Sequence, residues 1–263
     1  LLLILRSVDG ACHAPAMKSS IPLLAPPSEL VRIAGINEVI QSVCTICGQM
    51  LGAALLLAFN MSVVMLLDVA GAFMACISLL FVFIPNPAKK GTNRNILHEM
   101  YEGARIILRN RGMSWLMVSE IAVTFFVMPI VAVMPLMTLQ YFNGTPYQVS
   151  LMEMLFGIGL LVGGSILGVW NPKIRKSILL IIGYFGLGMS LALCGALPST
   201  YFVTYAVLTM IHGLVVPLYT GPFTALLQTQ FAPSSLGRIF SLYGSIRQFP
   251  SVIGLLLTGF IAD

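Results

Sequence analysis

Long apolar segments separated by short polar connections constrain this chain more than any other feature. Seven runs, at 34–58, 61–84, 113–138, 149–170, 177–197, 200–227 and 237–262, approach or exceed the roughly 20 residues that a helix needs to cross a bilayer. An eighth run, from Leu1 to about Met17, is interrupted by Arg6, Asp9 and His13. Only 9% of the residues are charged, against roughly 25% in soluble domains. The sequence therefore predicts an all-α polytopic membrane protein of about eight transmembrane helices.

Basic residues alternate with these runs in a way that predicts the orientation of the chain. The connections at 59–62, 140–150 and 197–200 contain no Lys or Arg, whereas the connections that alternate with them do. Clustered Lys and Arg in short loops stay on the cytoplasmic side. We therefore expect the basic loops on the cytoplasmic side of a cell membrane. The net charge of +5 then comes from basic loops held at the cytoplasmic membrane surface, and no nucleic-acid partner is expected.

The loop at 85–112 holds six of the fourteen Lys and Arg residues. Within it, apolar residues recur at helical spacing from Ile96 to Leu108, and charged residues fill the other face. This pattern predicts an amphipathic helix lying flat on the membrane surface. A short soluble helix between two domains would place its residues no differently, so both interpretations are open at this point.

Glycines and an internal repeat indicate how the helices are organised. Gly159, Gly163 and their neighbours line one span, where small residues allow helix backbones to approach closely in lipid. The stretch 25–33 resembles 232–239, which places Arg32 and Arg238 206 positions apart. At that offset the run at 113–138 has no counterpart within the chain. The sequence therefore predicts a fragment of a protein with two similar six-helix halves, an arrangement typical of transporters.

Several motifs carry a resemblance to a known family. The stretch from Leu5 to Ala14 resembles the fourth-helix motif of the major facilitator superfamily. Residues 13–26, 67–68, 153–159 and 237–241 are similar to its bacterial macrolide-efflux branch. The resemblance implies a partial major-facilitator fold in two bundles, with the fourth to the eleventh of that family's twelve helices. Its divisions would be 1–84 (helices four to six), a cytoplasmic linker at 85–112, and 113–263 (helices seven to eleven, with the twelfth missing).

Charged residues within the runs are the candidates for transport chemistry, because a charge near the bilayer centre costs several kcal/mol. The candidates for a proton or substrate pathway are Arg6, Asp9, Asp68, Glu120, His212 and Arg247. Arg6 and Asp9 lie one turn apart, so we expect them to pair. Purely structural ion pairs or hydrogen bonds are the alternative for these residues. Glu38 and Glu153 are expected at the membrane interface. The candidates for lining a cavity are Phe125, Phe126, Met128, Tyr219 and Tyr243.

These patterns favour a secondary transporter and not an enzyme. The three histidines lie on separate elements, and Cys44-x-x-Cys47 has no second ligand pair, so no catalytic residue, cofactor or metal is expected. The preferred hypothesis is proton-coupled antiport that exports amphiphilic drug-like compounds such as macrolides, with multidrug resistance as its consequence. Its partners would be a small amphiphilic substrate, protons and the lipid bilayer. The resemblance to a bacterial branch implies a location in the bacterial cytoplasmic membrane. A siderophore or lysolipid transporter of the same fold, or a non-transporting membrane sensor, are the alternatives.

Overall fold

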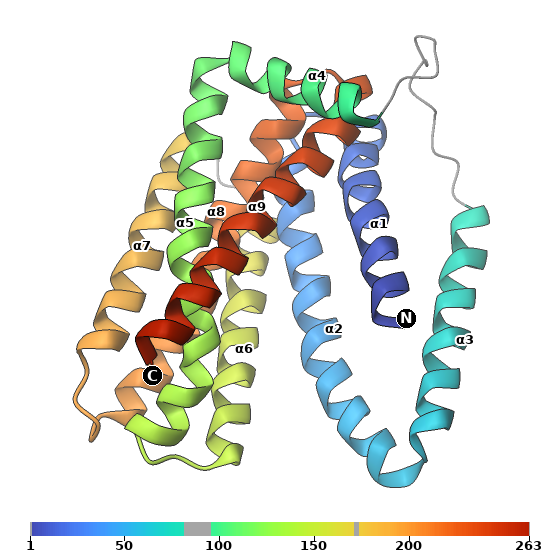
Figure 1. Ribbon diagram of the computed structural model, residues 1–263. Helices are drawn as coiled ribbons and strands as arrows, with labels where there is room; N and C mark the ends of the chain where they lie inside the picture. Colours follow the sequence, from blue (N-terminus) through green and yellow to red (C-terminus); the bar gives the residue numbers. More distant parts are fainter. Residues whose placement is uncertain (1, 82–95, 171–173, 263) are drawn as a thin grey trace.

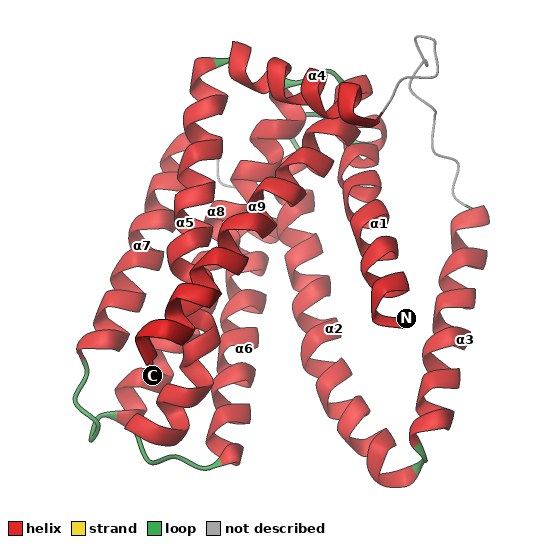
Figure 2. Ribbon diagram, in the orientation of Figure 1, coloured by secondary structure: helices red, strands yellow, loops and turns green. Residues whose placement is uncertain are grey.

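The computed structural model describes residues 2–81, 96–170 and 174–262 (Figure 1). Within these ranges the chain forms helices and no strand (Figure 2). The helices are α1 (Leu2–Leu24), α2 (Leu30–Ala58), α3 (Met61–Leu80), α4 (Ile96–Arg109), α5 (Arg111–Leu136), the π-helical turn η1 (Met137–Tyr141), α6 (Pro146–Trp170), α7 (Lys176–Ala196), α8 (Phe202–Gln230) and α9 (Pro233–Ala262). Each predicted apolar run coincides with one helix, so the all-α fold class is confirmed.

Five stretches of the described residues are long and apolar enough to cross a membrane. They are Leu30–Gly48, Arg111–Tyr141, Pro146–Val169, Lys176–Ala196 and Phe202–Gln230. The apolar part of α3, Val63–Ser78, is shorter. These helices make the chain a multi-pass membrane protein.

The loops that connect the helices lie at two opposite ends of those helices. Helix α4 and the starts of α2, α5, α7 and α9 lie together at the top of Figure 1. Arg32, Arg111, Lys176 and Arg238 belong to these starts, so we call this the basic end. The α2–α3, η1–α6 and α7–α8 turns, none of which carries Lys or Arg, lie at the opposite end. This is the alternation that the loop charges predict.

Helix α4 is the amphipathic helix expected in the central loop. It lies across the basic end, transverse to the other helices (Figure 1). Ile107 is buried in a cluster that includes Met113 and Ile239, which attaches α4 to α5 and α9. Nη1 of Arg238 also donates a hydrogen bond of 2.7 Å to Oε2 of Glu102 on α4. The start of α9 is thereby fixed to the linker helix.

Glycines allow the closest helix crossings, as the sequence predicts. A Cβ atom added at Gly159, Gly163 or Gly213 would collide with a backbone carbonyl oxygen across the α6–α8 contact. At Gly35 on α2, an added Cβ would lie 2.7 Å from the carbonyl oxygen of Gly164 on α6. These crossings bring backbones together in a way that no larger residue allows.

The helices before the linker pack mainly on those after it. Helix α1 lies against α9, and α2 lies against α6 and α8, whereas α1 and α2 touch each other little in the described part of the chain. Helix α3 has few contacts with α2. Residues 1–84 therefore contact residues 113–263 through α1 and α2, which pack on α6, α8 and α9. We call 1–84 and 113–263 the two sides of the linker.

Candidate functional site

A buried carboxylate lies where α5, α7 and α9 meet. Glu120 is 3% exposed and shares its buried face of α5 with Met113, Met117 and Thr124, which follow helical spacing. The phenol of Tyr184 donates a hydrogen bond of 2.9 Å to its Oε1. The phenol of Tyr243 donates one of 3.1 Å to its Oε2. Both carboxylate oxygens are therefore satisfied, as a buried acid requires.

Aromatic rings keep the two phenols in place. The ring of Tyr184 lies 5.2 Å from that of Tyr219, and the ring of Tyr243 lies 5.0 Å from that of Phe223, measured between centroids. Tyr219 and Phe223 are themselves buried in α8. This packing limits the rotation of the phenols and keeps them directed at Glu120.

Two cations, Arg247 and Lys18, lie within electrostatic range of Glu120, and Lys18 also lies within range of Glu38. Arg247 lies one turn after Tyr243 on α9 and interacts electrostatically with Glu120. Lys18 of α1 interacts with Glu120, Arg247 and Glu38. Oε1 of Glu38, on α2, accepts a hydrogen bond of 3.1 Å from the hydroxyl of Thr220 on α8. We call Lys18, Glu38, Glu120 and Arg247 the charge cluster; it contains two cations and two anions, drawn from both sides of the linker.

A small polar cavity adjoins the charge cluster between α1, α2 and α8. Its volume is about 60 Å³, and its polar lining consists of Lys18, Asn37, Glu38, Thr220, Thr224 and Gln228. A buried water needs roughly 10–15 Å³ of such volume, so a few waters fit. Nε2 of Gln228 donates a hydrogen bond of 2.7 Å to the carbonyl oxygen of Lys18, which links α8 to α1 beside the cavity.

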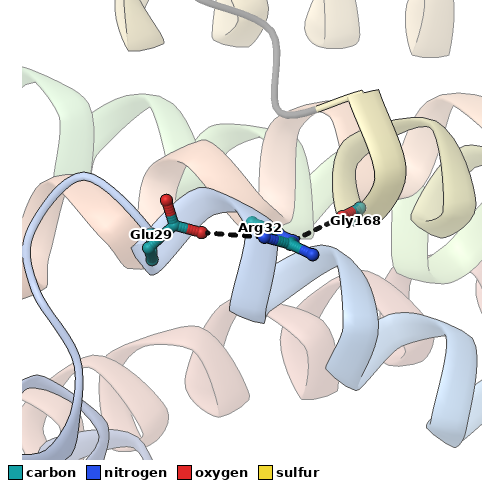
Figure 3. Close-up of polar contacts among 3 residues, drawn as sticks. All are labelled: Glu29, Arg32 and Gly168. Carbon is teal, nitrogen blue, oxygen red and sulfur yellow. Dashed lines mark hydrogen bonds and ion pairs between the residues drawn. The ribbon is translucent and has the colours of Figure 1, made fainter.

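The basic end is closed by a contact between α2 and α6 (Figure 3). Nε of Arg32 donates a hydrogen bond of 3.1 Å to the carbonyl oxygen of Gly168, and Nη1 lies 3.3 Å from Oε2 of Glu29. Gly168 belongs to the last turn of α6, where carbonyls lack intrahelical partners and a cation is favourable. Together with the Gly35 crossing, this contact joins the two sides of the linker at the basic end.

A larger cavity lies between α2, α5, α6 and α8. Its volume is about 290 Å³. We call it the His212 cavity, because His212 of α8 lines it and is only 2% exposed. The imidazole packs edge-on against the ring of Phe156, with centroids 5.4 Å apart. Glu153, one turn before Phe156 on α6, also lines the cavity.

The structure brings only some of the predicted site residues together. Glu120 and Arg247 share the charge cluster, with Tyr219 and Tyr243 beside it, whereas His212 lines the separate cavity. The side chains of Arg6, Asp9 and Asp68 lie outside the described part of the structure, so their pairing stays a prediction.

The aromatic residues predicted to line a cavity are placed differently from one another. Phe126 lies six residues after Glu120, on another face of α5, and is 66% exposed. Phe125 and Met128 are half-buried. The linings of the polar cavity and the His212 cavity include none of Phe125, Phe126, Met128, Tyr219 and Tyr243. A lining role for these residues stays a prediction.

Two members of the charge cluster, Lys18 and Glu38, are not among the pathway candidates that the sequence predicts. Glu38 was expected at the interface because its span was predicted to begin at residue 34. Helix α2 begins at Leu30, so Glu38 lies eight residues, or roughly 12 Å, after the first residue of that helix. Its position relative to the membrane interface stays a prediction. The first apolar run is predicted to end at about Met17, but α1 continues to Leu24, so Lys18 lies within the helix. Pro26 and Pro27, which precede the first helical residues, were the available signal for the earlier start of α2.

Comparisons with known proteins agree with this architecture. The sequence profile of the Major Facilitator Superfamily matches residues 1–255. Macrolide efflux protein A of Streptococcus pyogenes is 36% identical over 100% of this chain, which spans 65% of the length of that protein. Macrolide efflux protein A of Enterococcus faecalis is also 36% identical, over 97% of this chain and 80% of its own length.

A more distant relative is the uncharacterized MFS-type transporter YkuC of Bacillus subtilis, 22% identical over 74% of this chain and 48% of its own length. No solved structure matches the chain. The profile covers nearly the whole sequence, and its helical, membrane-spanning architecture is the one that the structure shows. The chain therefore belongs to the Major Facilitator Superfamily.

Proposed function

We propose that this protein is a secondary active transporter of the bacterial cytoplasmic membrane, which exports amphiphilic drug-like compounds such as macrolides in exchange for protons. The basic end then faces the cytoplasm, in keeping with the distribution of Lys and Arg. The relatives named as macrolide efflux proteins support the substrate class. The observation that carries proton coupling is the charge cluster around buried Glu120.

Glu120 would carry the proton because its protonation changes the net charge of the charge cluster. With Glu120 ionised, the charges of Lys18, Glu38, Glu120 and Arg247 sum to zero. Protonation leaves a net charge of +1, removes the attraction of Lys18 and Arg247 for Glu120, and leaves those two cations to repel each other across α1 and α9. The protonated and ionised states therefore differ in how strongly the cluster joins the two sides of the linker.

This coupling has the direction that antiport requires. The structure is closed at the basic end, where α1 and α2 contact α6, α8 and α9. A proton that reaches Glu120 from outside weakens this contact and favours opening toward the cytoplasm. Loss of the proton to the cytoplasm restores the attraction and favours closure of the basic end while the substrate is bound within the transporter. A proton thus biases a two-state element, which is what coupling needs.

The test is the isosteric substitution Glu120→Gln, made in the protein expressed from its complete gene. The amide carbonyl still accepts a hydrogen bond from one phenol, but the side chain no longer titrates. We expect macrolide export driven by an imposed pH gradient in proteoliposomes to be lost, while macrolide binding persists. Tyr147→Phe, a substitution at an exposed side chain outside the charge cluster, serves as the control. Normal pH-driven export by Glu120→Gln would show that another group carries the proton.

A further inference from the structure

The turn between α4 and α5 carries a group of exposed arginines. Arg105 and Arg109 lie four residues apart on α4, Arg111 is the first residue of α5, and all three side chains are exposed. Residues four apart share one face of a helix, where two like charges repel each other. We call Arg105, Arg109 and Arg111 the arginine corner.

The arginine corner lacks the acidic partners that two other arginines of the basic end have. Arg32 lies 3.3 Å from the carboxylate of Glu29, and Arg238 lies 2.7 Å from that of Glu102. Within the part of the chain that the structure describes, the side chains of the arginine corner form no ion pair or hydrogen bond. Glu102 lies three residues before Arg105 but is bonded to Arg238 instead. The three positive charges therefore suit an anion from outside the chain.

Hydrogen bonds hold the turn beneath these arginines in one shape. The backbone N–H of Asn110 donates a bond of 3.0 Å to the carbonyl oxygen of Ile107, and Oδ1 of Asn110 accepts one of 3.3 Å from the backbone N–H of Met113. The hydroxyl of Ser114 donates a bond of 3.0 Å across the turn to the carbonyl oxygen of Ile107. Ile107 and Met113 are also buried in the same cluster. The turn is therefore fixed before any ligand binds.

An apolar strip continues from the arginine corner along α5. Trp115 and Val118 are exposed, and they lie four and seven residues after Arg111, so the three share one face of the helix. This part of α5 belongs to a membrane-spanning stretch, and tryptophan is typical of the level where headgroups meet acyl chains. The turn itself lies at the top left of Figure 1, at an edge of the basic end. Along this face the surface changes from basic to apolar, in the same order as the headgroup and the chains of a phospholipid.

We propose that the arginine corner binds the headgroup of an anionic phospholipid, whose acyl chains lie along Trp115 and Val118. A guanidinium group binds phosphate oxygens through two parallel hydrogen bonds. A zwitterionic headgroup brings a positive charge beside its phosphate, so it gains less from three arginines. The apolar strip favours a lipid over a soluble phosphate, which would leave that strip unused. This site is separate from the charge cluster and does not depend on the transported compound.

The experiment measures how brominated phospholipids quench the fluorescence of Trp115. The protein expressed from its complete gene, with every other tryptophan replaced by phenylalanine, is reconstituted in mixtures of phosphatidylglycerol and phosphatidylcholine, one of which is brominated. Bromine quenches only a nearby indole, so the dependence on composition gives the relative affinity of the two lipids for this face. The attraction of one arginine for an anionic surface corresponds to about fivefold in affinity. We therefore expect the wild type to prefer phosphatidylglycerol by about fivefold or more.

Variants and salt separate the arginine corner from the general charge of the basic end. The triple variant Arg105→Gln/Arg109→Gln/Arg111→Gln should bind the two lipids equally. The matched control is Arg175→Gln, which removes an exposed arginine from the connection between α6 and α7 and should keep the preference. In the wild type, about 1 M salt should weaken the preference, because it shortens the Debye length to about 3 Å. Excess glycerol 3-phosphate, which has the phosphate but no acyl chains, should leave the preference unchanged.

Each outcome decides the proposal. Equal affinity of the two lipids for the wild type, or a preference that survives in the triple variant, overturns it. An equal loss of preference in Arg175→Gln would assign the effect to the whole basic end and overturn a specific site. If the triple variant does not fold, the wild type decides, since a preference unaffected by about 1 M salt also overturns the proposal. Loss of the preference in glycerol 3-phosphate would identify a soluble phosphate as the ligand and overturn the lipid.

Discussion

Replacing Gly35 by alanine should weaken the closure of the basic end. An added Cβ would lie 2.7 Å from both the carbonyl oxygen of Gly164 and the Cβ of Leu167 on α6. Optimal contacts between carbon atoms are about 3.5–4.0 Å, so α2 and α6 would have to separate by roughly 1 Å. The same movement would lengthen the hydrogen bond from Arg32 to Gly168, which is 3.1 Å in the closed arrangement.

The magnitude follows from the part of this cost that differs between the closed and open states. Alanine is a better helix former than glycine by about 0.5–1 kcal/mol, but α2 is helical in both states, so this gain cancels. The steric cost exists only while α2 and α6 touch, and overpacking of this kind typically costs about 1–3 kcal/mol. The open fraction should therefore rise by a factor of about 5 to 150.

A cysteine at position 37 would report the opening. Asn37 lines the small polar cavity behind the Gly35 crossing, so its accessibility from the basic end depends on separation of α2 from α6 and α8. In a background without native cysteines, labelling by a membrane-impermeant maleimide in inverted vesicles should accelerate in Gly35→Ala. Gly48→Ala is the matched control on the same helix, because a Cβ there meets nothing within 4 Å. Equal labelling rates in the two variants would refute the tight crossing.

Two further predictions concern orientation and the linker helix. A cysteine replacing Tyr147, which is 78% exposed at the opposite end, should be labelled from outside intact cells, whereas one replacing Gly112 at the basic end should not; the reverse pattern would invert the topology. Arg238→Ala should lower the free energy of unfolding by about 1.5–3 kcal/mol, because it removes a partly buried hydrogen bond of 2.7 Å between two charged groups. An unchanged Tm in detergent would show that this ion pair does not hold α4 in place.

The helices of this protein are predictable from sequence because apolar length is a local property. The α6–α8 crossing is also visible in the sequence, since Gly159 and Gly163 on one helix and Gly213 on another mark surfaces without side chains. Which face of each helix is buried against other helices is harder to predict. Helix α5 is apolar on nearly all sides, because lipid and protein interior both favour such residues, and so the sequence does not distinguish exposed Phe126 from buried Thr124.

The charge cluster could not be predicted for a different reason. Lys18 and Glu38 precede the linker, whereas Glu120 and Arg247 follow it, and nothing in the local sequence of either pair specifies the other. From sequence, the depth of a charged residue is predicted only from its distance to the end of its span. For Glu38 that distance depends on the first residue of α2. A difference of four residues in that helix start corresponds to roughly 6 Å along the helix axis.

The distribution of charge within the cluster explains how the two sides could separate at low cost. Lys18 and Glu38 lie on α1 and α2, and Glu120 and Arg247 lie on α5 and α9, so each side carries one cation and one anion. If both cations lay on one side, opening would leave two like charges together in the membrane, at several kcal/mol. With balanced sides, opening breaks the Thr220–Glu38 hydrogen bond and the attraction across α1 and α9, but each side keeps an internal counter-charge. Under the proposed function, protonation of Glu120 would unbalance one side alone and would thereby favour opening.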